Sequence, residues 1–231
     1  HGLNETAVRR LREQGVSLMI TVDCGVGSED EIVLGAGLGM DTVVTDHHTV
    51  SSGLSSAVAT INPRRPDSEY PYPDLTGAGM AFKLAEALYE SAGRDRPERL
   101  LELAALGTVA DVGPLTGENR HIVKMGLERL NATRSPGILA LMGRAALKPG
   151  SVDTSSLSFK IIPRLNSAGR LGDARASLDL LTAESAEVAE PLAARLERDN
   201  DERRRLTEQG MVESRAQVEA KRAAGALPPA L

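Results

Sequence analysis

Residues 43–48 read Val-Val-Thr-Asp-His-His and hold two of the four histidines of the chain. The β-branched start predicts a strand whose end carries Asp46, His47 and His48. Successive side chains of a strand point to opposite faces, so one imidazole can face a site while the other contacts a different group. A carboxylate and two imidazoles are suitable ligands for a divalent metal ion. The alternative for this tripeptide is a solvated turn after an edge strand.

The composition is that of an ordinary globular protein. The chain has 231 residues, of which 41% are hydrophobic and 26% charged, so one or two domains with a sizeable core are expected. No apolar run approaches the roughly 20 residues that span a bilayer, and no membrane partner is expected. Cys24 is the single cysteine, which excludes an internal disulfide and favours a reducing compartment such as the cytoplasm. Because the first residue is His1, the chain is expected to be a fragment or a processed product.

The charge balance restricts how this chain could handle nucleic acid. The formal net charge is −5, only 2% of residues are aromatic and there is no tryptophan. A protein with a basic surface throughout, or with a broad base-stacking platform, would have a different composition. Any contact with nucleic acid is therefore expected at one local site, or with help from parts outside this chain.

The elements around residues 43–48 predict a parallel sheet. The expected elements are a helix over 4–14 capped by Asn4, a buried strand over 17–22, a helix opened by Ser28 and Glu31 at capping-box spacing, a strand over 41–45 and a short strand over 57–61. Strand–helix–strand units of this length give parallel strands joined by right-handed crossovers. Ligands of such sheets bind beyond the carboxyl ends of the strands, which is where Asp23 and Asp46 fall.

Two helices follow the predicted sheet and a surface loop over 62–76. The first runs from Thr76 to about Ser91. Two roles are open for its glycine-rich start: the helix N-terminus could hold an anion, or the glycines could permit close packing of helices. The second, over 98–111, is apolar on most sides and ends at Asp111. A carboxylate at the end of a buried helix is costly unless it is paired or metal-bound. The alternative is an aspartate that caps the next turn.

Residues 160–172 are locally basic in this acidic chain, with Lys160, Arg164 and Arg170. Small residues between the two arginines would let a phosphate approach, and arginine suits bidentate phosphate contacts. The alternative is a solvated loop.

Helices are expected over 119–131 and 136–147. From residue 174 the chain looks helical to about 224, with kinks or breaks at Pro191 and Gly210. Its charge-dense part is typical of a solvated face, and a long polar helix would also suit a rigid connector to another domain.

Four segments occur together in the order and spacing of the DHH phosphoesterase family. They are residues 21–25, 45–48, 107–112 and 164–170. The chain resembles most closely the branch of exonucleases specific for single-stranded DNA, which act in repair and recombination, and the resemblance covers nearly its whole length. Two alternatives stay open: a small-molecule or oligonucleotide phosphohydrolase of the same family, and a non-catalytic interaction module on the same scaffold.

The resemblance implies an α/β fold with a parallel-sheet DHH domain over residues 1–182. A long connecting helix over 183–224 would lead towards a C-terminal DHHA1-type domain, and residues 225–231 would be a linker. The family's first motif, an Asp-x-Asp on the first strand, is absent from this sequence. The chain by itself is therefore expected to be a poor nuclease.

The resemblance also implies a site for two Mn²⁺ or Mg²⁺ ions. Asp23 would bridge the ions, with His47 and Asp111 as further ligands. His48 would face the substrate phosphate, and Asp46 would orient the histidines. The phosphates of the single-stranded nucleic acid would be held by Arg164, Asn166 and Arg170. Repair proteins are possible further partners, and the sequence does not identify them.

Overall fold

The computed structural model describes residues 2–50, 56–170 and 173–224. The chain forms two compact units. The first consists of His1–Ala132 and Val152–Leu157, and the second of Thr133–Ser151 and Ser158–Leu231. No helix in the described ranges has both the length and the apolar character needed to cross a membrane.

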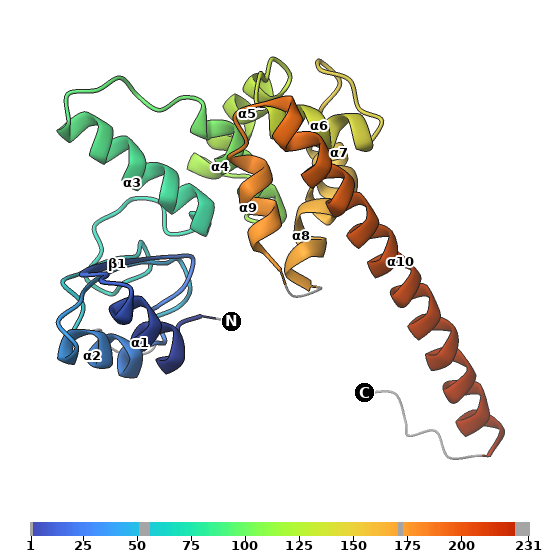
Figure 1. Ribbon diagram of the computed structural model, residues 1–231, viewed down its shortest axis with the longest axis horizontal. Coiled ribbons are helices and arrows are strands. Elements are labelled where there is room, and N and C mark those ends of the chain that lie inside the picture. Colours follow the sequence, from blue (N-terminus) through green and yellow to red (C-terminus); the bar gives the residue numbers. More distant parts are fainter. Residues whose placement is uncertain (1, 51–55, 171–172, 225–231) are drawn as a thin grey trace. The chain divides into compact units, whose positions relative to one another are not determined.

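A parallel sheet of three strands is the centre of the first unit (Figure 1). The strands are β1 (Leu18–Val22), β2 (Asp41–Thr45) and β3 (Ala59–Ile61), in the order β1-β2-β3. Their last residues are in register, with Val22 beside Thr45 and Thr45 beside Ile61. The predicted parallel strands are thus confirmed, and the residues that follow the three strands emerge side by side.

The helices of the first unit lie close to their predicted positions, except for the short α7, which was not predicted. They are α1 (Glu5–Glu13), α2 (Glu29–Gly37), α3 (Gly77–Ser91), α4 (Leu100–Ala110), α5 (Gly117–Leu130) and the single turn α7 (Thr154–Ser156). Asn4 caps α1 as expected, because its side chain accepts a hydrogen bond from the N–H of Ala7. Ser28 precedes α2, but its side chain makes no capping hydrogen bond, so the expected capping box is wrong.

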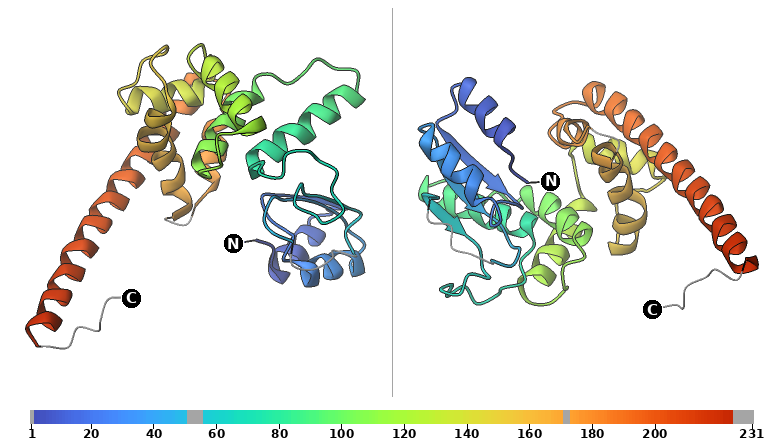
Figure 2. Two further views of the ribbon diagram at one scale, coloured as in Figure 1. Left: turned by 180° about the vertical axis from the view of Figure 1, so that it is seen from behind. Right: turned by 90° about the horizontal axis from the view of Figure 1, so that it is seen from below.

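One face of the sheet is covered by α1 and α2, which lie together in both views (Figures 1 and 2). Val8, Met19 and Met40 form the buried contact between these helices and the strands. The expectation that β1 is buried on both faces is wrong. Only its second and fourth residues are buried, while Leu18, Ile20 and Val22 are exposed on the other face. The run of apolar residues alone could not show that alternation.

The described part of the second unit contains five helices. They are α6 (Pro136–Arg144), the π-helix η1 (Leu157–Ile161), α8 (Ile162–Arg170), α9 (Arg175–Leu181) and α10 (Ala186–Ala223). The first half of α10 packs on α6, α8 and α9 through Ala189, Ala193, Leu196 and Asn200. Residues 204–224 are all exposed, which fits the expected solvated helix.

Two expectations for this region are wrong. Residues 162–170 form a helix and not a loop. They continue the helical run of α7 and η1 without a break, so Pro163 lies directly after the π-turn of η1. The break in the C-terminal helical stretch lies at 182–185, before Ser185 caps α10 through the N–H of Val188. The long helix then continues through Pro191 and Gly210. The assignment of residues 1–182 to one catalytic domain stays a prediction.

Candidate metal centre

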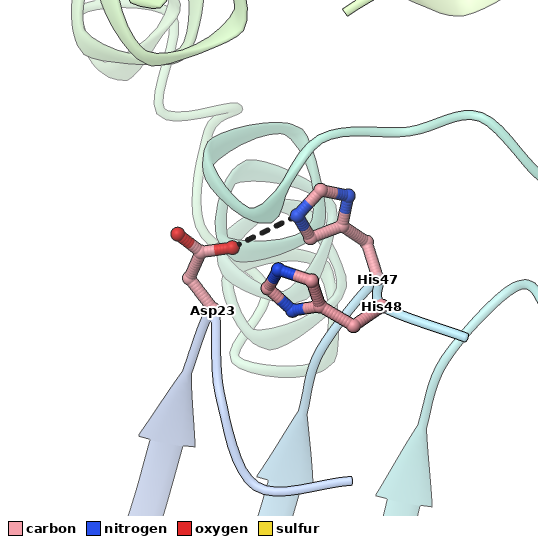
Figure 3. A group of neighbouring side chains, drawn as sticks. All are labelled: Asp23, His47 and His48. Atoms are coloured by element: carbon pink, nitrogen blue, oxygen red, sulfur yellow. Dashed lines mark ion pairs between the residues drawn. The ribbon is translucent and has the colours of Figure 1, made fainter. Parts of the chain in front are cut away.

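Asp23, His47 and His48 come together at the carboxyl ends of β1 and β2 (Figure 3). Asp23 follows β1 directly, and its N–H donates to the carbonyl of Thr45 at 3.0 Å, which continues the pairing with β2 by one residue. Its φ of +64° lies in the left-handed region, which aspartate tolerates better than most residues. The turn therefore brings the Asp23 carboxylate alongside the residues that follow β2.

The Nε2 atom of His47 lies between two carboxylates. It is 3.0 Å from Oδ1 of Asp23 and 3.8 Å from Oδ2 of Asp111. The His47 side chain is only 12% exposed. Its Nε2 atom is buried and makes no hydrogen bond of proper geometry with any described residue, so the short contact with Asp23 is an ion pair. A buried nitrogen that faces two carboxylates and lacks a hydrogen bond is suited to a shared cation.

The pKa of His47 is raised above its usual value. The contact with Asp23 is the largest cause; burial opposes it, and the charge of Asp111 adds to it. Because a metal ligand must be a neutral imidazole, protons compete with the metal below this raised pKa. We expect the Mn²⁺ affinity to fall about tenfold for each pH unit once the pH drops below the raised pKa, measured by titration calorimetry between pH 8.5 and 6. A constant affinity over this range would contradict the role of His47.

Asp46 organises the turn that carries both histidines. Its buried carboxylate accepts hydrogen bonds from the N–H groups of Val26 (3.0 Å), His47 (2.8 Å) and His48 (3.2 Å), and it lies 2.7 Å from Nδ1 of His48. Burial alone would raise the pKa of Asp46, but these hydrogen bonds outweigh it and lower the pKa. Asp46 thus stays ionised, holds Nδ1 of His48 and leaves Nε2 of that ring for another group.

Asn62 is a positioning residue that sequence reasoning did not assign. It follows β3, is buried, and donates from Nδ2 to the carbonyl of His48 at 2.9 Å, while its Oδ1 accepts from the N–H of Arg64 at 2.7 Å. All three strands therefore contribute to fixing the histidine pair. Its position directly after a predicted strand, next to Pro63, was the available signal.

Asp111 is the C-cap residue of α4. Its side chain is 45% exposed, so its carboxylate does not have the cost in free energy that was expected for a buried charge. The N–H of Gly113 donates to the carbonyl of Thr108 and that of Val112 to the carbonyl of Val109, which is the Schellman pattern of a helix end. Val112 has a φ of +55° at the position where glycine is usual. This turn ends the helix so that the Asp111 carboxylate reaches His47.

Val112→Gly is expected to raise the free energy of unfolding by about 1 kcal/mol, because glycine adopts the left-handed backbone conformation of this residue without the strain that valine has there. Val112 is 87% exposed, so little burial is lost. Urea unfolding followed by circular dichroism measures the change. The matched control is Val218→Gly within α10, which should destabilise by about 0.5 kcal/mol. Equal effects of the two changes would contradict a strained turn after Asp111.

Gly77, the first residue of α3, provides the space for the Asp23 carboxylate. A Cβ atom at this position would lie 2.1 Å from Oδ1 of Asp23. Thr76 caps α3 and its hydroxyl lies 3.0 Å from that of Thr108, which joins the start of α3 to α4. The Asp23 carboxylate thus lies beside the first residue of α3, and the glycine allows its close approach, which supports the packing role that the sequence offered for it.

Gly77→Ala is expected to lower the Mn²⁺ affinity by about 10- to 100-fold, because Asp23 must move away from His47. Titration calorimetry measures the affinity, and circular dichroism checks the fold. Gly37→Ala at the end of α2 is the control, since an added Cβ there meets nothing within 4 Å. Unchanged binding by the Gly77→Ala protein would show that Asp23 is not a ligand.

The basic segment belongs to the second unit. Arg164 is bound by Glu197, with Nη2 at 2.8 Å from Oε1 and a second contact through Nε, and it also donates to the carbonyl of Lys160 at 2.6 Å. These contacts brace α8 against α10. Asn166 is exposed, and the side chain of Arg170 lies outside the described residues. Phosphate binding by Arg164, Asn166 and Arg170 stays a prediction, as does the approach of this segment to the histidines.

The donor set fits a manganese or magnesium ion. Asp23, His47 and His48 each offer one ligand atom, all within 4.8 Å of one another, and Asp111 adds a carboxylate near His47. Carboxylate and imidazole donors suit these ions. Burial and the charge of Asp46 raise the pKa of the nearby Cys24 thiol, which disfavours a thiolate ligand and hence a zinc-thiolate site.

Comparison with known sequences gives the same family. Residues 3–108 match the model of the "DHH family, N-terminal domain". The single-stranded-DNA-specific exonuclease RecJ of Bacillus subtilis (strain 168) is 40% identical over 206 residues, which cover 89% of this chain and 26% of the relative. RecJ of Escherichia coli (strain K12) is 38% identical over 224 residues, which cover 91% of this chain and 38% of the relative.

Solved structures agree in fold. Exonuclease RecJ bound to manganese has a TM-score of 0.80 and 35% identity, covering 92% of this chain and 53% of that one. RecJ from Thermus thermophilus in complex with Mn²⁺ has a TM-score of 0.78 and 35% identity, covering 90% of this chain and 31% of that one. A complex of RecJ from the same organism with Mg²⁺ has a TM-score of 0.63 and 29% identity, covering 91% of this chain and 35% of that one.

The chain spans between about a quarter and two fifths of the length of these two curated relatives. The α/β fold with a parallel sheet and a long C-terminal helix is confirmed. The resemblance to the exonuclease branch is confirmed as well. Residues 3–108 therefore match the N-terminal domain of the DHH family, and the chain resembles the RecJ exonucleases over about nine tenths of its length.

Proposed function

We propose that this chain is the metal-dependent phosphodiesterase core of a RecJ-like exonuclease for single-stranded DNA. The observation that carries the proposal is the buried, unbonded Nε2 of His47 between the carboxylates of Asp23 and Asp111. The relatives support it, because they are named as single-stranded-DNA-specific exonucleases, and the related solved structures hold Mn²⁺ or Mg²⁺.

Two divalent ions would be held by Asp23, His47 and Asp111. Ions bound there would polarise a phosphoryl oxygen and lower the pKa of the attacking water. The chain's own contribution is orientation. Asp46 holds Nδ1 of His48, so that Nε2 of that exposed ring is available to a phosphate oxygen of the substrate. Asn62 keeps the His48 backbone in place.

Phosphates of the substrate would be contacted by Asn166 and Arg170. The carboxylates of a metal centre repel a polyanion, and guanidinium groups at the substrate's phosphates would offset that repulsion and stabilise the charge that develops during transfer. Arg164 could take part only if it exchanged its contacts with Glu197 for a phosphate. The main role of Arg164 is therefore to hold α8 against α10, and phosphate binding is its secondary role.

The biological setting is part of the same proposal. We propose a role in DNA repair and recombination in the cytoplasm, with residues 1–182 as catalytic domain. Residues 183–224 would connect to a DHHA1-type domain through the linker 225–231. The RecJ names of the curated relatives and the exposed second half of α10 support this arrangement.

A panel of substrates tests the proposal. A 5′-phosphorylated single strand, the matching duplex, pyrophosphate and a dinucleotide are each incubated with Mn²⁺ and this chain, and with a polypeptide of the relatives' length that contains it. We expect degradation of the single strand alone, slow with the short chain, and abolished by His47→Ala. Hydrolysis of only pyrophosphate or the dinucleotide would instead indicate a small-molecule phosphohydrolase. No hydrolysis and no Mn²⁺ binding would indicate an interaction module.

A further inference from the structure

The residues of the candidate metal centre come from two separate parts of the first unit. His47 and His48 follow β2, whereas Asp111 ends α4. The loop over 62–76, between β3 and α3, contacts both parts. Its hydrogen bonds form a continuous path from the histidine pair to the turn that follows Asp111.

The first half of this path runs through Arg64. Asn62 donates from Nδ2 to the carbonyl of His48 at 2.9 Å, and its Oδ1 accepts from the N–H of Arg64 at 2.7 Å. The guanidinium of Arg64 then reaches across the loop. Its Nε donates to the carbonyl of Pro73 at 3.2 Å and its Nη2 to Oδ1 of Asp74 at 3.1 Å. One arginine therefore joins the start of the loop to its end.

The second half of the path runs through Asn119 of α5. This side chain is fully buried, and its Nδ2 donates to the carbonyl of Asp74 at 2.7 Å and to that of Pro114 at 3.2 Å. Pro114 lies in the turn that follows Asp111. The Oδ1 atom of Asn119 has no hydrogen-bond partner among the described residues. Because an unpaired buried oxygen is costly, this amide is a poor choice for packing alone, and its contribution is the pair of hydrogen bonds that it donates.

Tyr72 makes a second contact between the same loop and the same turn. Its hydroxyl lies 3.2 Å from the carbonyl of Pro114 and 3.2 Å from the hydroxyl of Thr116. Its ring packs on Gly117, where an added Cβ atom would lie 2.5 Å from the ring. The Asp111 side chain is 45% exposed, so the held turn, and not burial, fixes its carboxylate.

We infer that Arg64 and Asn119 are positioning residues of the metal centre, which set the place of the Asp111 carboxylate relative to His47. They do so by joining the loop over 62–76 to the turns that carry these two side chains. The inference rests on the proposed function only in that the metal ion is taken up there. Groups that orient metal ligands change metal affinity by about 10- to 100-fold, and residues that act through the backbone of a ligand should lie at the lower end of that range.

Titration calorimetry with Mn²⁺ at pH 8, on the 231-residue chain, tests the two residues. Asn119→Ala and Arg64→Ala should each weaken binding about tenfold. Arg64→Lys should restore part of the affinity, because an ammonium group can pair with Asp74 but cannot reproduce the fork that also reaches the carbonyl of Pro73.

Arg65→Ala is the matched control for the arginine. Arg65 is the next residue of the same loop, but it pairs with Asp67 and donates to the carbonyl of Thr60, neither of which belongs to the path. Its loss should leave the Mn²⁺ affinity unchanged. Arg64→Ala should unfold in urea like the unchanged chain, because the Arg64 and Asp74 side chains are 38% and 45% exposed. A lower affinity at unchanged stability separates positioning from a merely structural role.

A double-mutant cycle shows whether Asn119 acts through Asp111. In an Asp111→Ala background, Asn119→Ala should weaken Mn²⁺ binding by less than about twofold further, because no carboxylate is left to be misplaced. An equal loss of affinity in both backgrounds would show that Asn119 acts elsewhere, and would overturn the inference.

Hydrogen exchange in EDTA tests the path without the metal. Arg64→Ala should speed the exchange of the N–H groups of Val112 and Gly113 by at least about threefold, although they lie at the other end of the path. Arg65→Ala should leave their exchange unchanged. Faster exchange in a chain that binds no Mn²⁺ would support the path and contradict the proposed function. Unchanged exchange and unchanged Mn²⁺ affinity in the Arg64→Ala protein would overturn the inference and leave the nuclease intact.

Discussion

Replacing His47 with alanine is expected to weaken Mn²⁺ binding by at least about 100-fold while the fold is kept. The change removes the one nitrogen that faces both Asp23 and Asp111 and leaves their two carboxylates to repel each other. Loss of groups that merely orient a ligand already costs about 10- to 100-fold, so loss of the ligand itself should cost no less. Titration calorimetry at pH 8 measures the affinity, and circular dichroism checks the fold.

His121→Ala is the matched control for this change. His121 is an exposed histidine on α5 of the same unit, so its loss removes an imidazole without touching the strand ends. Mn²⁺ binding should be unchanged in that variant. If both variants bound Mn²⁺ like the unchanged chain, the metal would not be held at the ends of β1 and β2.

Arg164→Ala is expected to lower the free energy of unfolding by about 2 to 4 kcal/mol. The Arg164 and Glu197 side chains are only 12% and 24% exposed. Removing one partner of a buried pair leaves the other charge without compensation, which typically costs about 3 to 5 kcal/mol. Because Glu197 retains some access to water, the expected cost is somewhat below that range. Urea unfolding followed by circular dichroism measures it.

Arg144→Ala serves as the comparison, since Arg144 pairs with Glu190 at the surface, where the two side chains are 41% and 56% exposed. Such pairs contribute about 0 to 1 kcal/mol. An Arg164→Ala protein that unfolds like the unchanged chain but binds single strands poorly would show that Arg164 does not stabilise the contact between α8 and α10. That result would favour the phosphate contact that the sequence suggested.

The strand ends were predictable because their signals are local. Short β-branched runs and an N-cap at Asn4 placed the strands and the first helix within a few residues. Parallel strands then bring the residues that follow them to one edge. The grouping of Asp23 with His47 follows from that rule, and the structure shows it.

The features that could not be predicted depend on contacts between residues far apart in the sequence. Gly77 looks like an ordinary helix glycine until α3 is set against Asp23. Arg164 looks like a free loop cation, yet it lies in a helix and finds Glu197, 33 residues away. The exposure of alternate residues of β1 depends on which face α1 and α2 cover. Each of these facts is a tertiary contact with no periodic pattern in the chain.

Anomalous diffraction at the manganese edge, from crystals of the chain soaked in Mn²⁺, tests the metal centre most directly. We expect an anomalous peak bounded by the carboxylates of Asp23 and Asp111 and the Nε2 atom of His47. The peak should be absent from crystals of the His47→Ala protein prepared in the same way. Density elsewhere on the molecule, with none between these three side chains, would show that these residues do not hold the metal.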